Sequence, residues 1–385
     1  MIYLDNNATT KPAPEVIEEV LRYMTERWFN PSSPYGLAEE AKKDLEAFRT
    51  RVAQLLSCEP EGIIFTSGGT ESDNAAIKGY AFASMEKGKH IITAEIEHKA
   101  VLEPCRWLEK AMGFEITQLP VDRDGVVILE ELEEAIRPDT ILISVMAANN
   151  ETGVIQPIEE ITRIAHERGV PVHTDAAQAI GKIPVNVEEW GVDMLSASGH
   201  KFHGPRGVGF LYIKKGLKVT PLIHGGGHER KMRSGTENLA GIAGMTKALE
   251  IAVAGLDEYA ARVGALRDKL QTGITDRIPD VLVNGGRVAR TPNTLNVSVK
   301  YVEGESMLLW LDDEGIYASS GSACTSGDLD PSHVLLAMGL DHATAHGSLR
   351  FSLSRYTTED EIDRVIEVLP GVVERLRKMS PFGKE

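Results

Sequence analysis

The feature that most constrains the fold is a repeated alternation, between Pro14 and about Val253, of short apolar runs with longer segments of helical periodicity. The short runs are rich in β-branched residues and apolar at nearly every position, which is typical of parallel strands covered on both faces. We predict strands at 63–66, 90–93, 115–119, 140–146, 170–174, 194–197 and 209–213. The pattern therefore predicts an α/β protein with a mostly parallel seven-stranded sheet covered by helices.

The pattern changes after about residue 255. Helical periodicity returns at 260–278 and 359–377, and strands are predicted at 295–299 and 349–353, with a turn at Gly285-Gly286. A chain of 385 residues also exceeds one ordinary core. We expect a large domain over 14–255 and a smaller α+β domain formed by 1–13 and 256–385.

The first predicted helix begins at Pro14, which suits the first helical position. Apolar side chains then recur at helical spacing, at Val16, Ile17, Val20, Leu21 and Met24. We expect this stripe to be buried.

Charge and hydropathy exclude several kinds of partner. The net charge of −16, with no local Lys/Arg block, makes nucleic acid and membrane surfaces poor partners. The N-terminus has neither a basic nor an apolar signal region, and the most apolar later stretch, 239–256, is interrupted by Lys247 and Glu250. We expect a cytosolic protein.

Residues that can carry chemistry follow several of the predicted strands, where α/β proteins usually place their sites. Ser67-Gly68-Gly69-Thr70 follows the first strand and leads into a helix, with Thr70 as its expected N-cap. Free backbone N–H groups there would bind an anion, although a plain turn is the alternative.

An acid and a lysine follow two further strands. Asp175 could hold a pyridine nitrogen protonated or simply cap a helix, and Lys201, between His200 and His203, could form a Schiff base or be a surface charge. A metal site at the two histidines is the weaker alternative, because no third ligand is adjacent.

His98 follows the 90–93 strand, and Asn149-Asn150-Glu151-Thr152-Gly153 follows the 140–146 strand. A histidine could stack on a flat ring and exchange protons, or be an ordinary hydrogen-bonded residue. An anion cradle, a carboxylate, a lysine and a stacking group at one sheet edge together match the requirements of pyridoxal phosphate.

The three cysteines are too few and too scattered for a disulfide framework or a four-cysteine zinc site. Cys58 and Cys105 lie in helical, apolar surroundings and are expected to be structural. Cys324 lies in Ser319-Ser320-Gly321-Ser322-Ala323-Cys324-Thr325-Ser326-Gly327, a small and polar segment that we expect to be mobile, with a functional thiol.

Six ordered segments, from residue 3 to beyond Tyr356, resemble cysteine desulfurases of the first group, which includes the nitrogenase-associated and housekeeping iron–sulfur types. They are Tyr3-Leu4-Asp5-Asn6-Asn7-Ala8-Thr9-Thr10, Thr66-Ser67-Gly68-Gly69-Thr70-Glu71-Ser72, Asn149-Asn150-Glu151, the Lys201 segment, Arg233-Ser234-Gly235-Thr236 and the Cys324 segment. The resemblance implies the type I fold of pyridoxal phosphate enzymes. Gly69 stands where relatives often have Ala or Cys.

The resemblance also implies a role for each matching residue. Lys201 would form the Schiff base, Asp175 pair with the pyridinium, Gln178 bind the ring hydroxyl and His98 stack on the ring. The phosphate would be held by the cradle, namely by Gly69, Thr70, Ser198 and His200, together with Thr236 from the partner subunit of a homodimer. Asn150 and Arg350 would bind the substrate carboxylate.

The expected reaction converts L-cysteine to L-alanine and leaves the sulfur on Cys324 as a persulfide, for an iron–sulfur scaffold or another acceptor protein. Two other activities remain open, those of a selenocysteine lyase and of an aminotransferase. A further alternative is an iron–sulfur assembly partner in which Cys324 binds iron or a cluster transiently.

Overall fold

The computed structural model describes residues 1–320 and 330–379. Within them the larger sheet has seven strands in the order β2–β8–β7–β6–β5–β3–β4. Their bounds are β2 Ile63–Thr66, β3 His90–Ala94, β4 Glu115–Leu119, β5 Thr140–Ser144, β6 Val172–Asp175, β7 Met194–Ser198 and β8 Gly209–Ile213. Only β8 runs opposite to the other six strands of this sheet. The predicted mostly parallel seven-stranded sheet is confirmed.

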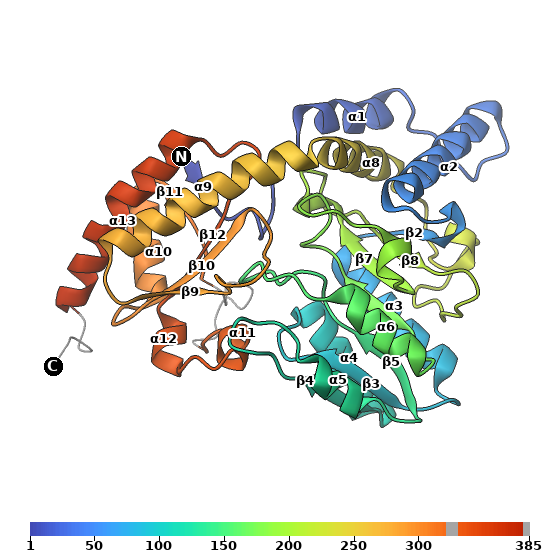
Figure 1. Ribbon diagram of the computed structural model, residues 1–385. Coiled ribbons are helices and arrows are strands. Elements are labelled where there is room, and N and C mark those ends of the chain that lie inside the picture. The colour runs from blue at the N-terminus through green and yellow to red at the C-terminus, as the bar shows by residue number, and fades with distance from the viewer. Residues whose placement is uncertain (321–329, 380–385) are drawn as a thin grey trace.

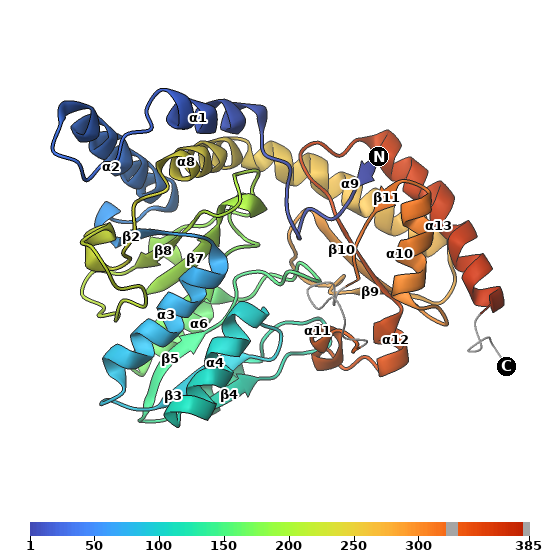
Figure 2. The same cartoon turned by 180° about the vertical axis from the view of Figure 1, so that it is seen from behind.

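Helices cover both faces of this sheet, which is why its strands read as continuous apolar runs. Helices α3 (Gly69–Ser84) and α4 (Lys99–Met112) lie on one face, and α5 (Leu129–Ala135) and α6 (Ile158–Glu167) lie on the other (Figures 1 and 2). Every position of the inner strands is buried, whereas the edge strand β4 buries only Leu119. The shorter elements are α7 (Val187–Trp190), η1 (Pro60–Gly62), η2 (Gly199–Lys201) and η3 (Glu229–Lys231).

Three helices pack together beyond β2 and β8: α1 (Pro14–Thr25), α2 (Gly36–Leu56) and α8 (Leu239–Ala254) (Figure 1). The prediction for α1 is only partly right. Val16 is fully buried, but Ile17, Leu21 and Met24 are 46%, 52% and 62% exposed. The helix carries two adjacent apolar stripes, and only the one containing Val16 and Tyr23 faces the core.

A second, three-stranded antiparallel sheet has the order β12–β10–β9, with β9 at Val281–Asn284, β10 at Thr294–Val299 and β12 at Ser348–Ser352. Helices α9 (Leu256–Arg277), α10 (Gly304–Asp313) and α13 (Glu359–Met379) pack with it. Strand β9 was not predicted, because it is short and only partly buried. The predicted turn follows it, with Gly285 at φ +67°.

The N-terminal segment joins this second unit before the chain enters the first. β1 (Ile2–Tyr3) pairs with β11 (Ile316–Tyr317), and Asp5 bridges to Ser352. Two short helices, α11 (His333–Ala337) and α12 (His342–His346), lie between the units (Figure 2). Their buried apolar residues belong to the core cluster of the larger sheet, and these residues are Val334, Leu335 and Ala345.

Candidate active site

The carboxyl ends of the parallel strands bring the predicted acid, lysine and histidine together. Asp175 is the last residue of β6, and Lys201 lies in the η2 turn directly after β7. His98 follows β3 as the N-cap of α4. The charges of His98 and Lys201 both act on the pKa of Asp175, so the three groups lie within electrostatic reach of one another.

The amine of Lys201 points at the N-terminal segment. Its Nζ donates to the carbonyl oxygens of Asn7 at 2.6 Å and Ala8 at 3.0 Å. The sequence placed this lysine correctly after a strand, and the structure adds that residues 7 and 8 bind its amine.

Asp175 is nearly buried, and burial raises the pKa of its carboxyl, while the Ala177 N–H, His98 and Lys201 lower it. Its Oδ1 accepts the backbone N–H of Ala177 at 2.8 Å, the capping role that the sequence allowed. The Oδ2 atom takes no part in that bond. The same carboxylate can therefore cap the turn through Oδ1 and pair with a cationic ring nitrogen through Oδ2.

His98 has a defined tautomer when neutral. Its Nδ1 accepts the N–H of Ala100 at 3.1 Å, so the ring proton lies on Nε2. Burial lowers the pKa of His98, and Asp175 opposes that shift. At neutral pH the ring is therefore uncharged, and its Nε2–H is a hydrogen-bond donor.

The glycine turn after β2 forms the start of α3, but the predicted N-cap is wrong. Gly68, at φ +151°, is the N-cap, the helix begins at Gly69, and Thr70 is its second residue. Gly209 allows this turn to approach β8 closely, because a Cβ on it would lie 2.7 Å from the Gly68 Cα. The exposed N-terminus of a 16-residue helix is a suitable site for a phosphate group.

Ser198, the last residue of β7, lies against the same turn, and His200 follows it in η2. A Cβ at Gly69 would lie 3.5 Å from the Ser198 Cβ, an ordinary contact, so an Ala at this position would also fit. His200 Nδ1 bonds the Thr9 hydroxyl at 3.1 Å, and burial lowers its pKa to about 4. A neutral His200 can donate to an anion through one nitrogen only.

Gln178 is held in one orientation by two hydrogen bonds. Its Nε2 donates to the Asn7 carbonyl at 3.0 Å, and its Oε1 accepts from Lys182. Lys182 is buried, and this burial, with the nearby charge of Lys201, lowers the pKa of its amine well below its ordinary value. Sequence analysis missed Lys182, although its spacing of four from Gln178 on a turn was a usable signal.

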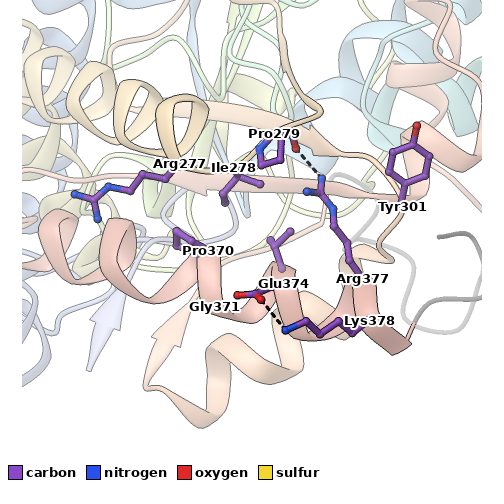
Figure 3. Close-up of a pocket in the computed structure, with 10 residues that line it drawn as sticks. Arg277, Ile278, Pro279, Tyr301, Pro370, Gly371, Glu374, Arg377 and Lys378 are labelled. Carbon is purple, nitrogen blue, oxygen red and sulfur yellow. Dashed lines mark hydrogen bonds and ion pairs between the residues drawn. The ribbon is translucent and has the colours of Figure 1, made fainter. Parts of the chain in front are cut away.

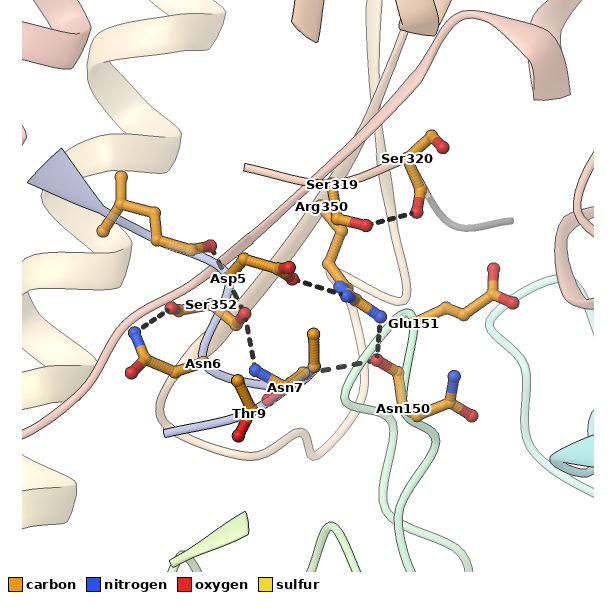
Figure 4. Close-up of polar contacts among 12 residues, drawn as sticks. Asp5, Asn6, Asn7, Thr9, Asn150, Glu151, Ser319, Ser320, Arg350 and Ser352 are labelled. Carbon is orange, nitrogen blue, oxygen red and sulfur yellow. Dashed lines mark hydrogen bonds and ion pairs between the residues drawn. The ribbon is translucent and has the colours of Figure 1, made fainter. Parts of the chain in front are cut away.

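Asn7 was also missed as a site residue. Its Nδ2 donates to the Asn150 carbonyl at 3.2 Å (Figure 4). The same nitrogen donates to the Thr294 hydroxyl at 2.9 Å. Its Oδ1 accepts from Lys182 at 3.0 Å and Asn293 at 2.9 Å. All four hydrogen-bonding positions of this buried amide are used, and its partners belong to segments of both sheets.

Arg350, on β12, faces the same place. Its Nη2 pairs with Asp5 at 2.7 Å, and its Nη1 donates to the Asn150 carbonyl at 3.1 Å (Figure 4). The side chain is 3% exposed, and within the described residues its Nε–H has no acceptor. An orphaned guanidinium N–H is a suitable donor to a ligand carboxylate. We call Asn7, Asn150, Glu151 and Arg350 the junction cluster.

The structure does not bring two of the predicted site residues, Thr236 and Cys324, together with the others. Thr236 is exposed and lies in the long connection between β8 and α8. Cys324 lies outside the described residues, as does the prediction of a mobile segment. Cys105 is buried and Cys58 half-buried, both are free thiols, and burial raises the pKa of each to about 12.

A groove of about 540 Å³ lies elsewhere, where α9 ends beside α13 (Figure 3). Its charged side chains already have partners within the fold. Arg377 donates to the Pro279 carbonyl at 2.7 Å, and Lys378 pairs with Glu374 at 2.6 Å. This groove is therefore not a candidate for the chemistry.

Within residues 1–320 and 330–379, no group of three or more His, Cys, Asp or Glu side chains could hold a metal ion. Over the same part of the chain, no single helix is long and apolar enough to cross a membrane. The α8–α9 pair passes that test only as two helices bent by 73°.

The class-V aminotransferase family model matches residues 2–365. The chain is 54% identical to cysteine desulfurase IscS of Methanosarcina thermophila, over 99% of this chain and 94% of that protein. It is 51% identical to a cysteine desulfurase of Trichormus azollae, over 100% and 96% of the two chains.

Solved structures agree with these relatives. A NifS-like protein superposes with a TM-score of 0.92 at 44% identity, over 97% of this chain and 100% of that one. SspA in complex with cysteine gives a TM-score of 0.83 at 37% identity, over 93% and 100%. The chain therefore belongs to the class-V aminotransferase family and, within it, to the cysteine desulfurases of the IscS and NifS-like type.

Proposed function

We propose that the protein is a pyridoxal phosphate-dependent cysteine desulfurase that converts L-cysteine to L-alanine and transfers the sulfur to Cys324 as a persulfide. The observation that carries the proposal is the meeting of Lys201, Asp175 and His98 at the end of the parallel strands. The membership of the chain in the cysteine desulfurases supports the choice of substrate.

The residues present fit the cofactor. Lys201 would bind it covalently, Asp175 would pair with its ring nitrogen, Gln178 would bind its ring hydroxyl, and His98 would stack on the ring. The cradle at the start of α3 would hold its phosphate, through Gly69, Thr70, Ser198 and His200. When bound, pyridoxal phosphate supplies an electron sink for the carbon that loses its proton.

Protein groups would supply the remaining chemistry. The Lys201 amine and the outer nitrogen of His98 are the groups that we propose to move the α-proton. Arg350, with its orphaned Nε–H, would hold the substrate carboxylate together with Asn150. We also propose that Asn150, whose carbonyl accepts from Asn7 and Arg350, contacts the cofactor.

Cys324 would complete the transfer as a thiolate. It attacks the substrate sulfur, the carbon–sulfur bond breaks, and the carbon keeps the electron pair and is protonated to give alanine. The new sulfur–sulfur bond leaves a persulfide that an acceptor protein can take. We propose an iron–sulfur scaffold as one such acceptor, in keeping with the IscS name of the relatives.

We also propose that the protein acts as a homodimer. The apolar stripe of α1 formed by Ile17, Leu21 and Met24 is exposed in a single chain, which is typical of an interface. Thr236, exposed on its long connection, would reach the phosphate in the partner subunit. We place the protein in the cytosol, where thiols such as Cys58 and Cys105 stay reduced.

The decisive experiment measures alanine and sulfide from L-cysteine in the wild type and in Cys324→Ser. We expect turnover to collapse in the variant while cofactor content and absorbance stay unchanged. Cys58→Ser, which changes a half-buried thiol, is the matched control and should keep wild-type turnover. Full turnover in Cys324→Ser would remove this residue from the mechanism.

The same assay separates the alternative activities. An aminotransferase would produce a keto acid from an amino acid donor without sulfide, and a selenocysteine lyase would prefer selenocysteine over cysteine. Loss of iron–sulfur scaffold binding without loss of desulfurase activity in Cys324→Ser would instead favour a role of this thiol in binding iron or a cluster.

A further inference from the structure

Glu71 is an acidic residue at the start of α3, where the proposed function places the phosphate group of the cofactor. It is the third residue of the helix, and its side chain is 17% exposed. Its Oε2 accepts the backbone N–H of Ser67 at 2.8 Å and so holds the glycine turn that precedes the helix. A carboxylate in the first turn stabilises a helix, but it also places a negative charge beside the N–H groups that would bind an anion.

The carboxyl of Glu71 is ionised at neutral pH. Burial acts to raise the pKa of Glu71, but the hydrogen bonds from Arg233 and Ser67 and the charge of Arg233 outweigh it, so the pKa lies below its ordinary value. A phosphate monoester carries about −1.5 to −2 charges at pH 7, so an uncompensated carboxylate in the same helical turn would repel it.

Arg233 supplies the compensating charge from the long connection between β8 and α8. Its Nε donates to the Glu71 Oε1 at 2.9 Å, and its Nη2 donates to Oε2 at 3.4 Å. The Arg233 side chain is 26% exposed, so solvent screens the pair only in part. The pair as a whole carries no net charge, and the start of α3 is therefore free of an uncompensated negative charge from Glu71.

Arg233 is not needed to hold this connection in place. Glu229, on the same connection, accepts from both terminal nitrogens of Arg49, at 2.8 Å and 2.9 Å, and from the N–H of Phe65 in β2 at 2.8 Å. The side chains of Arg49 and Glu229 are each 2% exposed, so this buried pair anchors the connection to β2. Loss of the Arg233 side chain would therefore change the charge at the start of α3 more than the course of the chain.

We propose that Arg233 is a positioning residue, which neutralises Glu71 and so allows the start of α3 to hold a doubly charged phosphate group. Arg233 thereby contributes to the preference of the site for pyridoxal phosphate over pyridoxal, which has the same ring but no phosphate. The inference rests on the proposed function, because that function assigns the cofactor phosphate to this turn. It adds a residue that acts on cofactor binding through Glu71, without a contact to the phosphate itself.

The test measures the dissociation constants of pyridoxal phosphate and of pyridoxal for the full-length chain after removal of bound cofactor, by titration of the absorbance of the bound ring. Arg233→Met should weaken the binding of pyridoxal phosphate about tenfold and that of pyridoxal less than about twofold, because only the phosphate meets the uncompensated charge of Glu71. Glu71→Gln should bind pyridoxal phosphate at least as tightly as the wild type, since its amide oxygen can still accept from Ser67. The double variant should return to within about twofold of the wild type.

Salt dependence separates an effect of charge from a loss of structure. The ratio of the Arg233→Met and wild-type dissociation constants for pyridoxal phosphate should shrink as the salt concentration rises from about 0.05 M to about 0.5 M, because salt shortens the range of the repulsion. Arg137→Met is the matched control. Arg137 pairs with Glu115 at 2.5 Å and with Asp139 at 2.8 Å at the amino ends of β4 and β5, the opposite edge of the same sheet, and its loss should leave both dissociation constants unchanged.

Three results would overturn the inference: equal losses of affinity for both ligands in Arg233→Met, a double variant as weak as Arg233→Met, or a defect that salt does not change. The wild type, measured beside the variants, distinguishes failure of this inference from failure of the proposed function. If the wild type prefers pyridoxal phosphate and Arg233→Met keeps the same preference, only the role of Arg233 fails. If the wild type binds neither ligand, the proposed function fails as well.

Discussion

The strand-end residues, which are Lys201, Asp175 and His98, differ from the junction cluster in how the fold brings them together. Lys201, Asp175 and His98 each follow a strand of one sheet, and the parallel arrangement brings them together. The junction cluster instead joins the N-terminal segment, the loop after β5 and β12 through hydrogen bonds of Asn7 and Arg350. The comparison teaches that, in the proposed reaction, the first region would supply the reactive groups, while the second would hold the substrate carboxylate through Arg350 and Asn150.

The largest expected effect tests the strand-end region. Lys201→Ala should lower turnover by about 10⁴-fold or more, because it removes the covalent attachment point of the cofactor. Borohydride reduction followed by mass spectrometry should locate the cofactor on the Lys201 peptide of the wild type. An adduct at the neighbouring buried amine of Lys182 in the wild type would contradict the assignment.

The next effect tests whether the junction cluster also holds the two units together. Asn7→Ala removes all four hydrogen bonds of this buried side-chain amide and should lower the free energy of unfolding by about 3 kcal/mol. Urea denaturation measures this change. Asn30→Ala, which removes one exposed turn bond to Ser32, is the matched control. Equal losses of unfolding free energy in the two variants would show that the hydrogen bonds of Asn7 do not hold the two units together.

A smaller effect, on kcat/KM, should distinguish the junction cluster from the strand-end residues. Arg350→Lys should lower kcat/KM for L-cysteine about fiftyfold, mainly through KM, because an ammonium cannot reproduce the guanidinium fork. Cofactor binding, which depends on the strand-end residues, should stay intact. A matched exchange at the exposed Arg364 should change neither constant. A loss of cofactor in Arg350→Lys would show that the two regions are not separable.

The smallest effect concerns a contact between the N-terminal segment and the chain after η2. His203, after η2, bonds the Lys11 carbonyl through Nδ1 at 2.8 Å, and burial lowers its pKa from 6.5 to about 4. Its lowered pKa means that the neutral ring contributes stability above pH 6.5, which is lost as the pH falls towards 4. Between pH 7 and pH 5 this loss amounts to about 2 kcal/mol.

The measurement compares the unfolding free energies of the wild type and His203→Asn at the two pH values. Asn tolerates the positive φ of +68° at this position. The stability gap between the two proteins should narrow as the pH falls from 7 to 5. A gap that stays constant would mean that His203 keeps an ordinary pKa in the folded state.

The sequence by itself determined the larger sheet and the residues at its strand ends. Strands buried on both faces must be apolar throughout, so their positions are visible as runs, and the residues that follow them must meet at one edge. Lys201 and Asp175 could be placed in this way. Even the N-cap of α3 was missed by only two residues, at Gly68 instead of Thr70.

Only the tertiary structure decided what depends on contacts between distant segments. The burial of Val16 but not Ile17 on α1 depends on which side of the helix faces α8, and periodicity alone cannot choose between adjacent stripes. The partners of Asn7 and Glu151 come from segments far apart in the chain. Polar residues in loops carry no periodic pattern, so their hydrogen-bond partners become known only when the chain is folded.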